Sequence, residues 1–298
     1  MVIFVIEENN PMKTFLLTLL AFCFSNSFAY KTDSLSPKDS SQKGFYIKLS
    51  GGYGFGAGKT TTDFFSNIHI DTNRVWTNTQ IHVSLGSGMY YHLSGGYMFS
   101  ENFGLETGVS YLKGSEYKAS ETFDYPLGGS IAQYSYDEKL SANMLSFNLS
   151  FLTAFNCKKW NFATKMGIVF GIPEILNTYI RPNGYYPDKI DEYHYRYYKR
   201  MALGGTASIE IDYALSKKFQ VFSETTFNLS SYAPKHGTMF KYTSDGVDLT
   251  DSIGITEIKF VEHYDPTTAF QNPDEQQRLI VRYPMSSIIC NVGIRFKF

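Results

Sequence analysis

The sequence predicts an all-β protein, a transmembrane antiparallel up-and-down β-barrel of eight strands, with ten strands as the alternative. Three observations predict this fold class. Eight segments alternate apolar and polar residues, the connections between them alternate between short and long, and each segment carries an aromatic residue at its short-connection end. Together they indicate a closed sheet whose apolar face lies on the outside.

Strict alternation is the main evidence. Successive side chains of a strand point to opposite faces of its sheet, so alternation indicates a sheet with one apolar face. In the first segment Phe45, Ile47 and Leu49 share one face and Lys48 lies on the other. Each segment has about the ~9–11 residues that a tilted membrane-spanning strand needs. The eight segments are residues 44–56, 88–99, 103–112, 143–155, 160–170, 201–213, 219–229 and 288–298.

The connections fall into two length classes. The short ones are residues 100–102, 156–159 and 214–218, and the long ones are roughly residues 57–87, 113–142, 171–200 and 230–284. Short turns at one end and long loops at the other are typical of transmembrane barrels, whereas a soluble sandwich has no reason to segregate its loop lengths. Two stretches, 254–262 and 278–285, either extend existing strands past the membrane or add a hairpin, which would make ten strands.

Aromatic residues recur at one height of the apolar face. Each predicted strand places one of them at its short-turn end, which matches the aromatic girdles that barrels carry at membrane interfaces. The eight residues are Phe45, Phe99, Phe103, Phe155, Trp160, Tyr213, Phe219 and Phe298.

The opposite face is small and polar, and it contains both cations and carboxylates. An eight-stranded barrel is just wide enough for side chains to fill its interior. Buried charges need partners, so we predict a structural ion-pair network that plugs the lumen. Paired carboxylates also act as general acid and base in enzymes, but the interleaved cations favour the structural interpretation. The predicted members are Lys48, Glu106, Lys165, Glu210, Asp212, Glu224 and Arg295.

The beginning of the chain resembles an export signal. Lys13 precedes an apolar run too short to span a bilayer, and Ser27 and Ala29 supply the small residues of a cleavage site. We therefore interpret residues 1–29 as a signal peptide whose true start is Met12, because Glu7 and Glu8 do not suit a signal. Residues 30–43 are predicted to be a disordered periplasmic leader, and residues 44–298 to be the barrel.

Composition excludes several classes of protein. The net charge of −1 gives no electrostatic case for nucleic-acid binding. After the signal, Cys157 and Cys290 are too few and too differently placed for a disulfide framework. No later stretch has the ~18 consecutive apolar residues of a spanning helix. We expect no cofactor and no metal, because no motif for either is present.

The two ends of the barrel segment carry a family resemblance. With its signal (12–29), its opening FYIKLSGGYGFG (45–56) and its closing NVGIRFKF (291–298), the chain resembles the small outer-membrane β-barrel proteins of the OmpA/OmpX type, including the outer membrane protein beta-barrel domain group. The resemblance covers about residues 44–298, although the loops here are longer than in the smallest members. It implies an integral protein of the bacterial outer membrane, a monomer in contact with outer-membrane lipid and lipopolysaccharide.

The resemblance also implies an assembly signal at the C-terminus. In that family the terminal aromatic, with the alternating apolar residues before it, is similar to the signal that the barrel-assembly machinery recognises. The matching residues here are Phe298, Phe296, Ile294 and Val292.

The function we expect is not enzymatic. A porin-like barrel with a plugged lumen and long loops suits binding, adhesion or support of the envelope, because binding residues commonly lie on loops held by a rigid scaffold. In residues 185–200, Tyr193, Tyr195, Arg196 and Tyr197 form a candidate surface for lipopolysaccharide or an unknown extracellular partner. The same residues also fit strands that run on beyond the bilayer, and the two interpretations are compatible.

Two alternatives stay open. An outer-membrane barrel enzyme, either an omptin-like protease or a lipid-modifying enzyme, would need histidine and carboxylate at the outer rim, where His82, His236, His263 and Asp265 are candidates. A narrow pore for transport is the second alternative. Residues 245–251 are rich in acids but lack the spacing of an EF-hand, so we interpret them as a turn.

Overall fold

The computed structural model describes residues 43–58, 66–70, 76–80, 83–127, 130–157, 159–182, 189–253, 257–262 and 275–298. The predicted signal peptide and leader lie outside these residues, except for Lys43.

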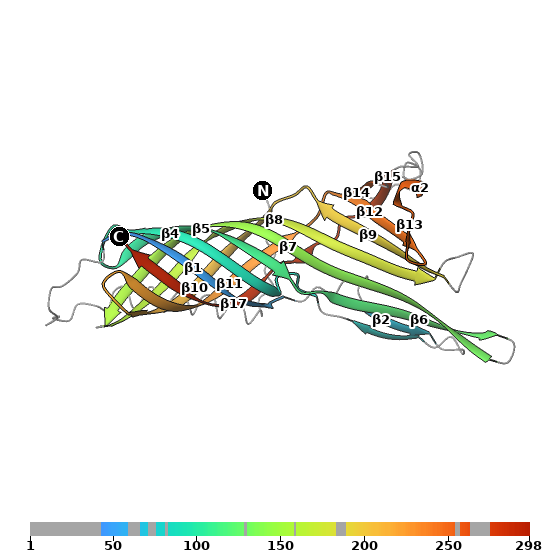
Figure 1. The fold of residues 1–298 in the computed structure, drawn as a ribbon, viewed down its shortest axis with the longest axis horizontal. Coiled ribbons are helices and arrows are strands. Elements are labelled where there is room, and N and C mark those ends of the chain that lie inside the picture. Colours follow the sequence, from blue (N-terminus) through green and yellow to red (C-terminus); the bar gives the residue numbers. More distant parts are fainter. Residues whose placement is uncertain are drawn as a thin grey trace. The chain divides into compact units, whose positions relative to one another are not determined.

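Eight of the described strands close into an antiparallel ring, in which each strand pairs with the next and β17 pairs back onto β1 (Figure 1). Each segment predicted from alternation overlaps one of these strands, so the predicted fold class is confirmed. The ring strands are β1 (Gly44–Gly56), β4 (Gly88–Met98), β5 (Phe103–Gly114), β7 (Ser130–Cys157), β8 (Trp160–Pro182), β10 (Ala202–Ala214), β11 (Phe219–Tyr232) and β17 (Ser287–Lys297).

The outer surface of the ring is apolar and its inner surface is polar. In β1, Leu49 is 56% exposed on the outside, whereas its neighbour Lys48 is fully buried inside. The same alternation runs through β17, where Val292 is 67% exposed and Arg295 is buried. Water-soluble monomers rarely expose contiguous apolar patches above ~600 Å². An apolar belt around a closed ring, with all its backbone pairs satisfied, is the surface of a barrel that spans a membrane.

The height of this belt can be followed along β8. Its outward side chains are apolar from Trp160 to Ile172, apart from Thr164, and the next outward residue is Glu174. Those twelve steps cover about 40 Å along a strand at ~3.3 Å per residue, which is about 30 Å of height at a tilt of ~40°. This height matches the hydrocarbon core of a bilayer, ~30 Å.

Two of the short turns are built in the same way. After β4, the N–H of Phe103 donates to Ser100 Oγ at 2.9 Å. After β10, the N–H of Phe219 donates to Ser216 Oγ at 3.0 Å. A serine hydroxyl therefore satisfies the first backbone donor of the returning strand in both turns.

The predicted aromatic girdle lies on the outer face at this end. Trp160 and Phe45 are 49% and 66% exposed, and the rings of Trp160 and Tyr213 lie 4.9 Å apart across the strand pair. Phe298 is 71% exposed, and its N–H donates to the carbonyl of Phe45 at 3.1 Å, beside the closing pair of strands.

The long connections contain further strands. β6 (Tyr117–Leu127) pairs with the part of β7 that runs beyond the ring, and β2 (Ser66–Ile70) bridges β6 and β3 (Trp76–Gln80). The part of β8 beyond the ring starts a second extension, which we call the upper sheet. It consists of β8, β9 (Ile190–Tyr198), β12 (His236–Ser244), β14 (Glu257–Val261) and β15 (Glu275–Leu279).

The two stretches that raised the ten-strand alternative do not join the ring. Most of the first becomes β14, which pairs with β12 and β15 in the upper sheet. The second contributes the end of β15 and β16 (Tyr283–Pro284), a short strand on the far end of β11. The ring therefore has eight strands among the described residues.

Small elements complete the upper sheet. The turn from β12 to β13 (Val247–Asp248) uses Asp245 and Gly246, both with positive φ, at 52° and 77°. Of the stretch 245–251 that was interpreted as a turn, residues 245–246 form the turn, whereas 247–248 are β13 and α2 (Thr250–Ile253) begins at residue 250. Within the described chain, no helix has the length and apolar character needed to cross a membrane.

Candidate functional site

The inner face of the ring carries a compact layer of charges. The structure brings together all seven residues predicted from sequence. Lys165 Nζ lies 2.8 Å from Glu106 Oε1, 2.8 Å from Glu224 Oε1 and 3.1 Å from Glu210 Oε2. Lys48 contacts the same three carboxylates, with Glu224 Oε2 at 3.1 Å and Glu106 Oε2 at 3.4 Å.

Arginine completes this charged layer. Arg295 contacts Glu210 and places Nη1 2.9 Å from Asp212 Oδ1, while Asn161 Nδ2 donates to Asp212 Oδ2 at 2.9 Å. The lumen layer thus holds three cations and four carboxylates, with each ion in contact with at least one opposite charge. Dense pairing of this kind is what makes buried charges tolerable.

The strand register explains why these residues meet. Lys48 pairs with Arg295 across β1 and β17, and Glu210 pairs with Glu224 across β10 and β11. Lys165 lies opposite Ser208, on the strand pair beside Glu210. The inward positions of neighbouring strands are therefore at one height, which alternation along the chain alone does not specify.

Aromatic rings support the cations. Lys48 Nζ lies 4.3 Å from the centre of the Phe222 ring, and the Arg295 guanidinium lies 4.6 Å from that of Tyr46. The Tyr46 hydroxyl also donates to Glu106 Oε2 at 2.8 Å. These contacts hold the charged groups in fixed positions, as a structural network requires.

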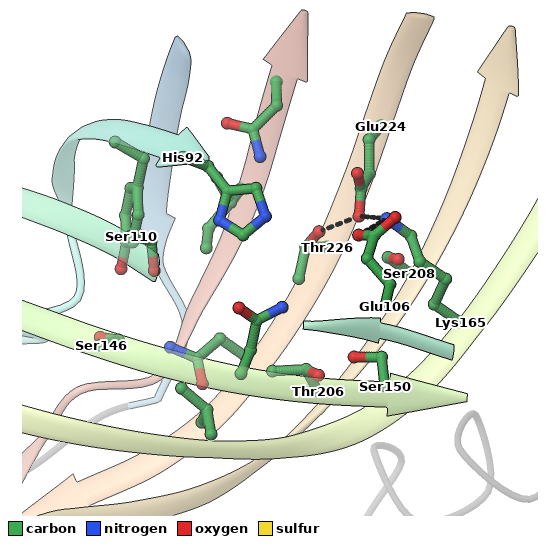
Figure 2. A pocket seen from close by; sticks show the side chains of 16 residues that line it. His92, Glu106, Ser110, Ser146, Ser150, Lys165, Thr206, Ser208, Glu224 and Thr226 are labelled. Carbon is green, nitrogen blue, oxygen red and sulfur yellow. Dashed lines mark hydrogen bonds and ion pairs between the residues drawn. The ribbon is translucent and has the colours of Figure 1, made fainter. Parts of the chain in front are cut away.

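A small polar cavity adjoins the charged layer (Figure 2). Its volume is about 60 Å³, and His92, Ser110, Ser146, Thr206 and other small polar residues line it. Glu106, Lys165 and Glu224 border it on the network side, as Figure 2 shows. A site of this volume and polarity holds a few water molecules, whereas pockets for small-molecule ligands measure ~300–1,000 Å³.

Apolar side chains close both ends of the lumen. At the short-turn end Tyr46, Met98 and Leu152 pack with Ala154 and Ala163. At the other end a larger core, which we call the upper core, begins at residues such as Leu112, Met144 and Met285. The charged layer and the cavity therefore lie between two apolar layers.

The upper core continues into the upper sheet. Its buried members in that sheet are Ile175, Tyr195, Tyr197, Met239, Tyr242, Ile258 and Phe260. This continuity overturns part of the surface-patch prediction. Tyr195 and Tyr197 are 7% and 1% exposed, so they are core residues, while Arg196 between them points outward. The strand interpretation of this segment describes them correctly, because β9 pairs with β8 beyond the ring.

Arg278 of β15 ties the edge of the upper sheet to this core. Its guanidinium lies 5.0 Å from the ring of Tyr195 and 5.8 Å from that of Tyr179, and Nη1 donates to the Tyr197 hydroxyl at 3.2 Å. Burial raises the pKa of Tyr197 to about 12, so its hydroxyl stays protonated.

Glu138 and Asn177 form a polar pair beside these tyrosines. Asn177 Nδ2 donates to Glu138 Oε1 at 2.7 Å. Burial raises the pKa of Glu138 above its ordinary value, although hydrogen bonds and Arg278 oppose the shift. The paired parts of β7 and β8 beyond the ring, where Glu138 lies opposite Tyr179, therefore bear part of the desolvation cost of a carboxylate.

The outward face of the upper sheet carries a patch that the sequence analysis missed. The pairing of β9 and β12 shifts register between Met239 and Lys241. Phe240 in this bulge is 44% exposed, 5.1 Å from the Arg196 guanidinium and 6.0 Å from the His194 ring. A bulge re-aims a side chain, and this one depends on the register between β9 and β12, which alternation along the chain does not specify.

The described histidines show where an acid–base site would lie. His194 Nδ1 is 3.1 Å from Thr178 Oγ1, and Nε2 is 3.5 Å from Glu192 Oε2. Burial lowers the pKa of His194, with Lys241 adding to the effect and Glu192 opposing it. His194 was not among the candidates predicted from sequence. Of those candidates the structure describes His236, which pairs with Tyr198 and Lys259 across the strands. His82, His263 and Asp265 lie outside the described residues.

Across the described ranges, no three His, Cys, Asp or Glu side chains lie where they would hold a metal ion. Cys290 is a free thiol on the outward face of β17.

Comparison with known proteins adds little detail. No protein-family model matches the chain, and no curated protein matches it either. Among solved structures, the outer membrane protease OmpT from Escherichia coli is similar, with a TM-score of 0.30 and 8% sequence identity over 90% of this chain and 99% of that one. At this score the two chains do not superpose closely enough for residues to be matched between them.

Proposed function

We propose that this chain is an integral protein of the bacterial outer membrane, that its ring is a closed anchor, and that its upper sheet presents a non-enzymatic binding surface. The observation that carries the proposal is the upper core, which runs without a break from the mouth of the ring into the upper sheet. Such packing holds a surface in a fixed position above the membrane, as rigid scaffolds do for binding residues.

The placement in the outer membrane rests on the surface of the ring. An apolar belt about 30 Å high around a closed antiparallel barrel is the architecture of outer-membrane proteins. The eight-stranded ring supports kinship with OmpA/OmpX-type barrels, whereas the length of β7 and β8 goes beyond the smallest of them. The signal-like segment at residues 12–29 is consistent with export.

The binding surface that we propose is the patch of His194, Arg196 and Phe240. Aromatic residues and arginine dominate binding hot spots at protein interfaces, and here a bulge holds the aromatic ring outward beside the arginine. This patch replaces the one predicted from sequence, of which Arg196 remains a member.

Fractionation and surface labelling test the placement. The protein should fractionate with outer membranes and shift in gel migration on heating. A cysteine introduced at Val247, which is 60% exposed in the upper sheet, should react with an impermeant maleimide on intact cells. Recovery as a soluble periplasmic monomer would contradict the proposal.

Attachment assays test the binding part. Cells that produce the wild-type chain should attach to one another or to cultured cells more than non-producing cells do, and Arg196→Ala with Phe240→Ala should remove the difference. Val247→Ala is the matched control, because it truncates an exposed apolar residue elsewhere on the upper sheet. A peptidase or lipid-hydrolysing activity lost on His194→Ala would favour the enzyme alternative instead.

A further inference from the structure

A groove of about 780 Å³ lies on the outer side of the barrel, where the apolar belt ends. Its floor is a row of exposed apolar side chains at one height. Across neighbouring strands, Tyr111 pairs with Leu145, and Leu145 pairs with Ile172. Met201 lies beside Ile172, because the next residue along the chain, Ala202, pairs with Gly171. These four side chains are 39–61% exposed.

The upper wall of the groove is basic. Above the floor, at the next outward position of these strands, Asn143 pairs with Glu174. Glu174 Oε1 forms an ion pair with Arg196 Nε at 2.8 Å. Lys199 and Arg200 complete the wall and are exposed. Glu174 is the one acid among the lining residues, against three cations, so the groove carries a net charge of +2.

Two of these cations are available to a ligand. Within the described part of the chain, neither Lys199 nor Arg200 forms an ion pair, whereas Arg196 is held by Glu174. Lys199 also adopts a left-handed conformation, with a φ of 68°. Glycine would take this conformation without strain, yet the chain places a lysine there, between β9 and β10.

From this geometry we infer that the groove binds a lipid with a phosphate headgroup, with an acyl chain along the floor and the phosphate at Lys199 and Arg200. The inference rests on the proposed membrane placement, because that placement brings acyl chains to the floor and headgroups to the wall. The occupant must be apolar at one end and anionic at the other. Arginine favours phosphate in particular, since its fork of N–H donors matches phosphate oxygens.

Native mass spectrometry of the full-length chain in mild detergent tests the inference. Phosphatidic acid is titrated against phosphatidylcholine with the same acyl chains, and the retained lipids are counted. A basic residue near an anionic leaflet strengthens binding about five-fold, so Lys199→Gln with Arg200→Gln should weaken retention of phosphatidic acid about thirty-fold. Retention of phosphatidylcholine should not change.

The matched control is Lys217→Gln with Lys218→Gln, which removes the same charge from an exposed turn at the other end of the ring. Equal losses in both double variants, or none in the first, would overturn the inference. Displacement by inorganic phosphate at the same concentration would also overturn it, because it would show an anion site without a lipid component.

Heat-dependent gel migration of each variant shows whether the barrel is folded. A folded barrel without selective retention refutes the lipid site and leaves the membrane placement intact, whereas failure to insert into vesicles refutes the placement itself. If the double variant does not fold, the single variant Arg200→Gln tests the lipid site instead. Its retention of phosphatidic acid should be about five-fold weaker than that of the wild type.

Discussion

The aromatic ring of Tyr46 lies directly against Gly96. A Cβ atom on Gly96 would fall 2.2 Å from Cζ, the tyrosine carbon that bears the hydroxyl. The same hydroxyl donates to Glu106 in the charged layer. A residue without a side chain therefore allows the short-turn end of the lumen to close and the network to be anchored there.

The first prediction concerns this contact. Gly96→Ala should displace Tyr46, because a clash this close cannot be relieved by small shifts, and overpacking typically destabilises by ~1–3 kcal/mol. Gly95→Ala is the control, since its Cβ would meet nothing nearer than the Tyr46 carbonyl oxygen at 3.7 Å. Urea unfolding in lipid vesicles should show a clear loss for the first variant and little change for the second.

Gly96 also shows which features of the fold the sequence can predict and which it cannot. Alternation is a local pattern, so it predicted the eight ring strands and the face on which each side chain lies. The charged layer could be predicted as well, because buried ions in a narrow barrel must find one another. The close approach at Gly96 could not, because it depends on which residue lies across the strand pair.

The upper sheet could be predicted only as strands that run beyond the bilayer, and its pairing could not, for a related reason. Residues of β9 and β12 carry polar and aromatic side chains on both faces, so alternation no longer separates inside from outside. Their pairing joins residues 38 (His236 with Tyr198) to 53 (Ser244 with Asp191) positions apart in the chain. The bulge at Phe240 and the groove floor from Tyr111 to Met201 likewise depend on register between distant strands.

The second prediction concerns Lys165, which contacts three carboxylates inside the ring. Lys165→Met should lower the free energy of unfolding by ~3–5 kcal/mol, because Lys48 is then the one lysine that contacts these three buried carboxylates, and a negative charge is left uncompensated. Adding Glu224→Gln should restore part of the loss, since one uncompensated charge is removed. Equal stability of the single variant and the wild type would contradict the structural role of the network.

Lys118 provides the matched control for that experiment. It pairs with Glu116 at 3.5 Å on the surface, where the two side chains are 69% and 51% exposed. Exposed pairs contribute ~0–1 kcal/mol, so Lys118→Met should change the free energy of unfolding only slightly. The contrast separates the effect of burial from the effect of removing a lysine.

The third prediction concerns pH and the paired parts of β7 and β8 beyond the ring. The pKa of Glu138 is raised by burial, so the folded state holds a proton over a pH range in which the unfolded chain has lost it. The stability of this β7–β8 pair should therefore fall as the pH rises through this range. Glu138→Gln should remove this dependence and protect the β7–β8 pair at neutral pH, because an amide oxygen can still accept from Asn177.

Hydrogen exchange of residues 130–142 and 171–182 between about pH 4 and pH 8 measures this effect. The free energies of local opening should converge at low pH and diverge in favour of the variant at high pH. A variant that is less protected than the wild type at neutral pH would show that the carboxylate is needed as an ion.

The fourth prediction concerns transport. The lumen holds a cavity of about 60 Å³ between apolar layers, while porins that enclose an aqueous channel have ~16–18 strands. Single-channel recordings in planar bilayers should show no large, stable conductance steps. Such steps from heat-modifiable, purified protein would support the pore alternative and show that the charged layer opens.

The last prediction concerns Phe298 and assembly in cells. Phe298 is 71% exposed at the membrane boundary, where a lipid-facing change costs only ~0–1 kcal/mol. Deleting it should therefore change the stability of protein refolded into vesicles by little. If the resemblance to OmpA/OmpX-type barrels is correct in this respect, the same deletion should sharply reduce the folded fraction in living cells, because the assembly machinery would lose its signal.

Phe45 separates recognition from lipid contact in that experiment. Its carbonyl oxygen accepts from the N–H of Phe298, and its side chain is 66% exposed at the same height. Phe45→Glu perturbs the same interface without touching the C-terminus, so cells should assemble it nearly as well as the wild type. Equal assembly defects in the two variants would assign the effect to the girdle and remove the evidence for a C-terminal signal. A defect confined to the deletion, with normal refolding in vitro, would support recognition of Phe298 during assembly.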